Sequence, residues 1–309
     1  IVALIKDELR KSSIQASEAT ICLSGKDLIV RNFEMPSLPK DELSTAVSFE
    51  AKKYIPFKLE EMISTFQARP DKAHKSQILF VAIKKSVLDK YSSIMAQLNI
   101  KISSIEYSSF SIFRLLKVSG AKDSGLIGVV NVDFEEESEV NFSVLDNGFT
   151  LFSRDISVVP EPGAPETAAG IPDPMAMEKL KSELRLSLDF YNRKFPGRTV
   201  SKVFLVTQDG ASSETQALIK DMSLNVQSID LGKVADRNIS SAFGLIRAYG
   251  CSLFKTIRIP LNINLLVAKK EKAGAITPGQ VDIKNIDLVS FVKGLKIDIK
   301  FIVLAVFIC

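Results

Sequence analysis

The order of strand-like and helix-like segments after residue 124 constrains the fold of this chain more than any other feature. Three apolar runs separated by turn residues, Gly125–Val132, Val140–Leu145 and Phe149–Ile156, predict an antiparallel meander. A stretch with five prolines follows at residues 158–176 and predicts an extended linker. The chain then alternates between helix and strand, the pattern of an α/β sheet. The predicted elements are Glu178–Lys194, Val203–Thr207, Ser213–Met222, Val226–Ile229 and Ser240–Leu253.

A similar alternation precedes the meander and predicts a compact α+β block. Leu43, Val47 and Ala51 recur at helical spacing, and Pro56 stops the helix to which they belong. The run QILFVAIK at Gln77–Lys84 is rich in branched residues, which is typical of a buried strand. The other elements predicted before the meander are helices at Ile5–Lys11, Ser86–Leu98 and Ser108–Lys117, and strands at Ala19–Cys22, Leu28–Phe33, Ser64–Ala68 and Ile100–Tyr107.

Charge and reactive side chains exclude several classes of function. The net charge of the 309 residues is +4, from 40 basic and 36 acidic residues, so the sequence predicts no nucleic-acid partner. His74 is the only histidine and lies in a polar loop without an acid signalled nearby, which argues against histidine-based catalysis. Cys22, Cys251 and Cys309 stand far apart without a CxxC spacing, so no zinc site is expected. We therefore predict no catalytic and no metal-binding residues.

The last nine residues, Phe301–Cys309, are uncharged and apolar. A membrane-spanning helix needs about 20 residues, so this run cannot cross a bilayer by itself. Lys293, Lys296 and Lys300 precede it, as on the cytoplasmic side of a membrane helix. We interpret residues 301–309 as the start of a truncated transmembrane helix, with a buried strand as the alternative.

The stretch VRNFEMPSLPKDELSTAVSFEAKKYIPFKLEEMISTFQ, Val30–Gln67, resembles the type IV pilus assembly protein PilM family. Its most specific part is Tyr54–Phe57. The resemblance implies an α/β, actin-like (ribonuclease H-like) two-lobed fold, related to the cell-division protein FtsA. The body would comprise residues 1–31 and 118–255, and a small inserted α+β subdomain, SHS2- or ferredoxin-like, would comprise residues 32–117.

The resemblance also implies a nucleotide site, which this sequence retains only in part. We expect the first phosphate-loop strands to be missing, because family members carry them before the point at which this sequence starts. In the second hairpin, Glu135, Glu136, Glu137 and Glu139 stand where the family has glycine and threonine, and the adenosine turn keeps only Gly210. Side chains block the backbone approach to an anion, and two like charges ~4 Å apart repel by about 1 kcal/mol in water and about 4 at a surface-like dielectric. We predict no cofactor and no ATPase activity; the alternative is ATP bound with Mg²⁺.

A second resemblance lies in Leu261–Leu266, which is similar to the I-N-L-L-P peptide of the PilN family, although Val267 replaces the proline. It implies that residues 256–300 form a PilN-like cytoplasmic tail and that the partner-binding residues are Asn262, Ile263, Asn264, Leu265 and Leu266. An extended peptide can add to a sheet edge, where Ile263 and Leu265 would fill pockets. The peptide would dock in cis or in trans; the alternative is an ordinary last strand of the domain.

Together these features predict a non-enzymatic scaffold on the cytoplasmic face of the bacterial inner membrane. Its expected partners are a PilN-like peptide, the inner-membrane platform proteins of a type IV pilus and the motor ATPases, with membrane attachment through a downstream helix. Two alternatives remain open: an actin-like ATPase, and a cytoplasmic component of type II secretion that resembles the GspL family.

Overall fold

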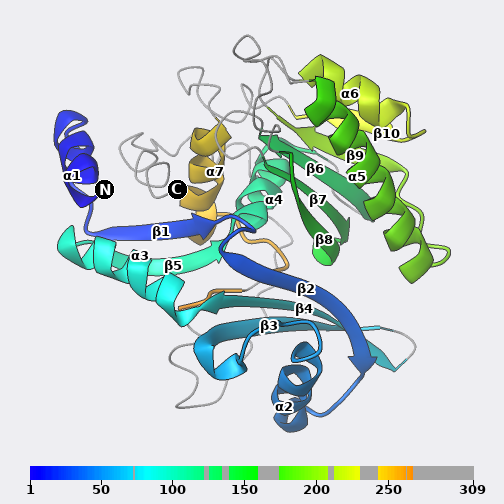
Figure 1. Cartoon of the computed structure of the whole chain (residues 1–309), viewed down its shortest axis with the longest axis horizontal. Coiled ribbons are helices and arrows are strands. Elements are labelled where there is room, and N and C mark those ends of the chain that lie inside the picture. Colours follow the sequence, from blue (N-terminus) through cyan, green and yellow to red (C-terminus); the bar gives the residue numbers. More distant parts are fainter. Residues whose placement is uncertain are drawn as a thin grey trace.

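The computed structural model describes residues 1–71, 74–121, 125–133, 139–158, 174–207, 212–229, 243–261 and 263–266. These residues form three sheets. Figure 1 shows the sheet of β1 and β5 on the left, the five-stranded sheet at the upper right, and the sheet of β2, β3 and β4 at the bottom. We call these parts the first lobe, the second lobe and the insert.

The second lobe has strand order β10-β9-β6-β7-β8. The strands β6 (Leu126–Asp133), β7 (Glu139–Asp146) and β8 (Phe149–Ser157) pair antiparallel, which confirms the predicted meander. The strands β9 (Lys202–Val206) and β10 (Asn225–Ser228) pair parallel, and β9 runs parallel to β6. Three antiparallel strands followed by two parallel ones on the other side of β6 form the sheet of a ribonuclease H-like lobe.

Helix α5 (Pro174–Lys194) lies between β8 and β9 in the chain, and α6 (Ser212–Lys220) connects the parallel strands β9 and β10. Of the apolar stripe Leu180, Leu184, Leu188 and Tyr191 that the sequence predicts for α5, Leu188 is half-buried and the other three are at most 2% exposed. Tyr191 lies against Phe152 of β8, with ring centroids 6.2 Å apart. The 3.6-residue period of the sequence therefore places α5 on the meander.

The first lobe contains β1 (Glu18–Leu23) and β5 (Lys101–Tyr107), which pair parallel. Its helices are α1 (Val2–Lys11), α3 (Lys85–Gln97), α4 (Ser108–Val118) and α7 (Phe243–Ser252), followed by the short helix η4 (Leu253–Lys255). Helices α4 and α7 cross closely, because a Cβ on Gly250 would lie 2.3 Å from the carbonyl oxygen of Ser111. Only glycine permits this approach.

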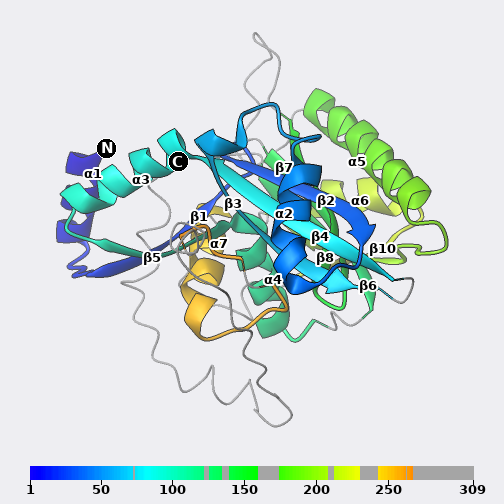
Figure 2. The same ribbon diagram turned by 90° about the horizontal axis from the view of Figure 1, so that it is seen from below.

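The insert consists of β2 (Leu28–Pro36), α2 (Lys40–Ala51), the 3₁₀ turn η1 (Leu59–Glu61), β3 (Met62–Pro70) and β4 (Lys75–Lys84). Its sheet is antiparallel with order β2-β4-β3. Alternate residues of β4 face opposite sides: Ile78, Phe80 and Ala82 pack in a small core with α2, whereas Leu79 and Val81 join the main core. Figure 2 shows α2 on the side of this sheet that faces away from the lobes.

The structure corrects the predicted boundaries of the insert. We predicted it at residues 32–117, but the three-stranded sheet spans Leu28–Lys84, and β5 pairs with β1 of the first lobe. The turn between β1 and β2 sends the chain to a different sheet, so these two strands do not form a hairpin. The result is a strand–helix–strand–strand unit, which is the SHS2 version of the prediction.

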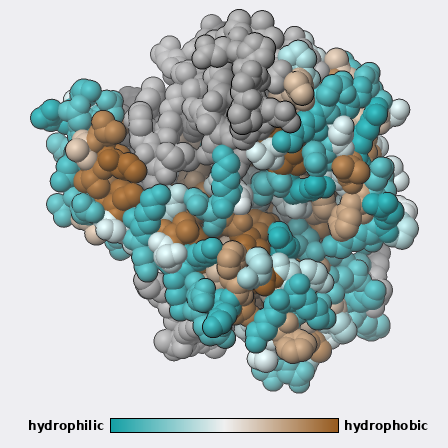
Figure 3. All heavy atoms as spheres, in the orientation of Figure 1, coloured by the Kyte–Doolittle hydropathy of each residue, from teal (hydrophilic) through white to brown (hydrophobic). Residues whose placement is uncertain are grey.

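The face shown in Figure 3 is mostly polar, and one of its apolar patches lies over the end of the molecule that α1 occupies. Ile1 and Leu4 are 64% and 69% exposed there. His74, the only histidine, is exposed and has a φ of 55°, as suits a residue in a tight turn. Its exposure agrees with the polar loop that the sequence predicts there.

Candidate docking site for residues 256–266

After η4 the chain returns along the first lobe. We call residues 256–261 and 263–266 the return segment. Its buried residues alternate along the chain: Ile257, Leu261, Ile263 and Leu265 are 2%, 6%, 3% and 0% exposed, and all four belong to the main core. A period of two is typical of an extended peptide with one face on a protein surface.

The return segment binds the free edge of β5. The amide of Leu265 donates to the carbonyl of Ile105 over 3.0 Å, and the amide of Ile105 donates to Oδ1 of Asn264 over 3.1 Å. The same Oδ1 accepts from the amide of Leu266 at 3.0 Å. The side-chain amide thus takes the place of a backbone carbonyl, and β5 acquires a partner on the side opposite to β1.

The insert and the second lobe also contact the return segment. Nε2 of Gln67 in β3 donates to the carbonyl of Pro260 over 2.6 Å. The ring of Pro260 lies on the turn between β7 and β8, where a Cβ on Gly148 would be 2.8 Å from Cγ of the proline. Nζ of Lys117 in α4 donates to the carbonyl of Arg258 over 2.9 Å. The segment therefore touches all three parts of the protein at once.

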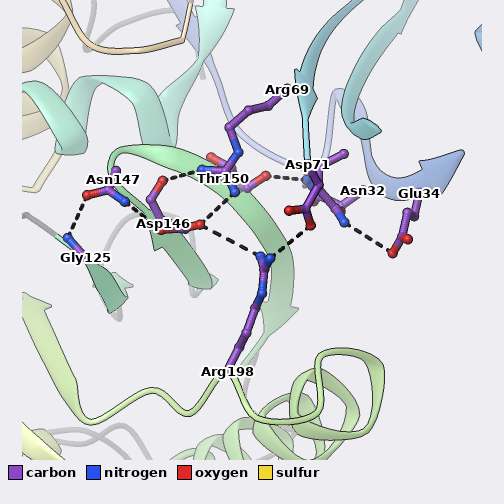
Figure 4. A network of polar contacts seen from close by, with 10 residues as sticks. Asn32, Glu34, Arg69, Asp71, Gly125, Asp146, Asn147, Thr150 and Arg198 are labelled. Carbon is purple, nitrogen blue, oxygen red and sulfur yellow. Dashed lines mark hydrogen bonds and ion pairs between the residues drawn. The ribbon is translucent and has the colours of Figure 1, made fainter. Parts of the chain in front are cut away.

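A polar network beside Gly148 fixes the insert against the second lobe (Figure 4). Asp146 at the end of β7 accepts from Arg69 of β3, with Nη2 and Oδ2 2.8 Å apart, and its carbonyl accepts from Nη1 of Arg69 over 2.8 Å. Arg198, after α5, binds Oδ2 of Asp71 at 3.0 Å and lies 3.8 Å from Asp146. Two arginines thus join two carboxylates from the insert and the second lobe, with each side chain between 25% and 35% exposed.

A buried ion pair lies behind the edge of β5. Glu106 is 0% exposed and Arg114 of α4 is 3% exposed, and they form two hydrogen bonds of 2.5 and 2.6 Å. Burial raises the pKa of Glu106 above its ordinary value, although Arg114 opposes this shift. The pair ties α4 to the strand residue that follows Ile105. Breaking it would leave an uncompensated charge in the core.

The sequence model of the family described as type IV pilus assembly protein PilM matches residues 1–158, just over half of the chain. The chain belongs to the type IV pilus assembly protein PilM family. This confirms the family inferred from Val30–Gln67.

Two solved structures are similar to this chain. One is described as a PilM-PilN type IV pilus biogenesis complex; it is 15% identical, covers 82% of this chain and 84% of that chain, and has a TM-score of 0.66. The other is the cytoplasmic domain of Epsl, an inner membrane component of the type II secretion system of Vibrio cholerae, with 10% identity, 65% of each chain covered and a TM-score of 0.42. The first match agrees with the actin-like fold predicted from the family.

The return segment contains four of the five predicted partner-binding residues, and Ile263 and Leu265 are buried in the main core. Their role in binding a partner stays a prediction. Asn262 lies outside the described residues. The sequence did not reveal the residues that receive the segment, Ile105, Gln67 and Gly148. For Gly148 the sequence contains a signal, because Asn-Gly indicates a tight hairpin turn and glycine has no side chain to cover it. Gln67 and Ile105 carry no such signal.

Most residues of the predicted nucleotide site, including Glu135–Glu137 and Gly210, lie outside the described residues, as do the side chain of Glu139 and the apolar run 301–309. The described part of the second lobe contains two buried polar atoms of interest. Oδ1 of Asn131 in β6 and Oγ1 of Thr207 after β9 lack hydrogen-bond partners among the described residues. Both residues stand at the carboxyl ends of neighbouring parallel strands, where open α/β sheets bind ligands.

Within the described ranges, there is no group of three or more His, Cys, Asp and Glu side chains that could hold a metal ion. Among the helices of the same ranges, none has the length and apolar character needed to cross a bilayer.

Proposed function

We propose that this PilM family member is a non-enzymatic scaffold that receives an extended peptide at the edge of β5, and that its own return segment occupies this site in cis. The observation that carries the proposal is the pair of hydrogen bonds between Ile105 and the Asn264–Leu265 backbone and side chain, combined with the complete burial of Leu265. Backbone bonds supply affinity in this mode, and pockets for alternate side chains supply specificity.

Two observations support a PilN-like peptide as the partner: the similarity to a solved PilM-PilN complex and the PilN-like sequence of residues 261–266. We infer that the segment acts as a built-in equivalent of a PilN peptide. The scaffold would stand on the cytoplasmic face of the inner membrane and link pilus platform proteins to motor ATPases. Tethering favours docking in cis, because a covalently linked peptide acts at an effective concentration in the millimolar range.

Nucleotide binding is the second candidate, and the unpartnered oxygens of Asn131 and Thr207 favour it. A nucleotide bound at the ends of β6 and β9 would satisfy them. Calorimetry with ATP and Mg²⁺ on the full chain separates the two candidates. Binding with micromolar affinity would support the nucleotide-switched protein, whereas no heat at millimolar ATP would support the passive scaffold.

The docking proposal is tested by deleting Pro260–Leu266 and following hydrogen exchange. We expect faster exchange at the amide of Ile105, which loses its acceptor Asn264, while the second-lobe sheet keeps its protection. Adding a synthetic peptide of residues 256–267 should restore protection at Ile105, and the same peptide with Asn264→Ala should restore much less. Unchanged protection after the deletion would contradict docking, and global unfolding would instead identify the segment as an ordinary last strand.

A further inference from the structure

Two cysteines that are 229 residues apart in sequence face each other between β1 and α7. Sγ of Cys22 lies 3.9 Å from the carbonyl oxygen of Arg247, and Sγ of Cys251 lies 3.7 Å from the carbonyl oxygen of Thr20. Arg247 and Cys251 are one helical turn apart, and Thr20 and Cys22 are on the same face of the strand. The Cys22 thiol contacts the carbonyl one helical turn before Cys251, and the Cys251 thiol contacts the carbonyl two residues before Cys22. The two sulfur atoms therefore lie opposite each other.

The environment makes the two thiols unequal. Cys22 is partly exposed, whereas Cys251 is 1% exposed. A hydrogen bond from the Cys251 thiol lowers the pKa of Cys22 below its ordinary value, and the nearby Arg247 guanidinium acts in the same direction, although burial and Glu106 oppose both. The same contact with Cys22, together with burial, raises the pKa of Cys251 well above its ordinary value. Cys22, the less buried of the two residues, is thus the one that more readily becomes a thiolate, and thiolates are the reactive form.

We propose that Cys22 and Cys251 are a redox-active pair, which peroxide converts to a disulfide bond between β1 and α7. This site is independent of the proposed scaffold function. Cys22 acts as the attacking sulfur and Cys251 as the resolving one. Neither role follows from the sequence, where the two cysteines show no common motif.

The reaction balances with hydrogen peroxide as the oxidant. The Cys22 thiolate attacks one peroxide oxygen, the O–O bond breaks, and the departing hydroxide takes up a proton to leave as water. Cys22 is then a sulfenic acid. The sulfur of Cys251 attacks the sulfur of Cys22, the S–O bond breaks, and the Cys251 proton leaves with the hydroxyl group as a second water. Two thiols lose two electrons to one peroxide, and a thiol reductant reverses the change.

The experiment treats the full reduced chain with hydrogen peroxide and maps the disulfides by mass spectrometry of unreduced peptides. Cys309 is the only other cysteine in the chain, so Cys309→Ser is the matched control. We expect the wild type and the Cys309→Ser variant to lose two hydrogen atoms at the same rate and to yield a linked peptide pair containing Cys22 and Cys251. Cys251→Ser should stop at a sulfenic acid on Cys22, which dimedone traps.

Cys22→Ser should slow the oxidation of Cys251 by about tenfold or more, because the remaining thiol is 1% exposed and its burial still raises its pKa. Circular dichroism of each serine variant shows whether it is folded, and Cys22→Ala serves as a second variant if the serine variant is not. The proposal is overturned if Cys309 is consumed while Cys22 and Cys251 stay reduced, or if the disulfide that forms contains Cys309.

Discussion

Replacing Gly148 with alanine tests the contact between the return segment and the second lobe. The new Cβ would lie 2.8 Å from Cγ and 2.9 Å from Cδ of Pro260, closer than non-bonded carbon atoms approach. Gly148 also has a φ of +79°, a conformation that costs alanine energy wherever it occurs. The substitution therefore combines a backbone penalty with a clash, and the two have to be separated.

The Gly197→Ala variant serves as a control that measures the backbone penalty without the clash. The φ of Gly197 is +78°, and a Cβ at this position would meet nothing within 4 Å. Gly197→Ala should cost only the backbone term, about 1–2 kcal/mol in the free energy of unfolding. Gly148→Ala should cost that amount plus about 1–3 kcal/mol for overpacking. Since Pro260 is exposed and can shift, we expect the extra cost to lie near the lower end, about 1 kcal/mol.

Urea denaturation of the two variants and of a double-mutant cycle with Pro260→Ala measures the extra cost directly. The ring atoms that clash with the new Cβ are absent in Pro260→Ala, whose own Cβ would lie at the 3.7 Å now seen for the proline. We expect the coupling energy of the cycle to recover the difference between Gly148→Ala and Gly197→Ala. Equal costs for the two glycine variants, or a coupling energy of zero, would show that the return segment does not rest on this turn in solution.

Three further variants test the surroundings of the site. Arg114→Met leaves the Glu106 carboxylate buried without its cation and should lower the free energy of unfolding by about 3–5 kcal/mol in urea denaturation, where a loss below about 1 kcal/mol would contradict the burial argument. Burial and the nearby Asp155 raise the pKa of Tyr107 well above 10.0, so above that pH only the unfolded chain releases the proton, and stability should fall with rising pH. Tyr107→Phe should flatten this fall in denaturation measured at several alkaline pH values; an unchanged slope would assign it to other groups. Arg69→Gln removes a partly exposed ion pair and should cost about 1 kcal/mol at low salt and less at high salt, which a salt series of melting curves can check.

The sequence predicted the elements of the second lobe well because their signals are local. The apolar stripe Leu180, Leu184 and Tyr191 has the period of a helix, and the turn at Asn147–Gly148 separates two strands that pair with each other. A hairpin or an amphipathic helix is specified within a window of about 20 residues, and such windows can be read without knowledge of the rest of the chain.

Long-range pairings could not be read in the same way. Residues 19–22 and 28–33 are separated by a turn and have the local appearance of a hairpin, yet β1 pairs with β5, about 80 residues away, and β2 pairs with β4. The boundary of the insert was wrong for this reason, because it depends on which sheet β5 joins. The meeting of Cys22 with Cys251 and of Leu265 with Ile105 likewise depends on the assembled fold. In each of these pairings the residues can be recognised in the sequence, but the topology of the fold decides which residue each of them contacts.

A peptide that touches three units binds only the arrangement in which those units face one another. The return segment forms hydrogen bonds with Ile105 of the first lobe and Gln67 of the insert, and it packs on Gly148 of the second lobe. Its docking free energy therefore also stabilises this arrangement against others. The segment follows η4 directly, and the amides of Thr256 and Ile257 bond back to the carbonyl of Leu253. An identical peptide from a second molecule would make the same contacts, so cis and trans docking differ only in effective concentration. A competing peptide would displace the return segment only at a concentration of about 1 mM, or by binding more tightly than the return segment does.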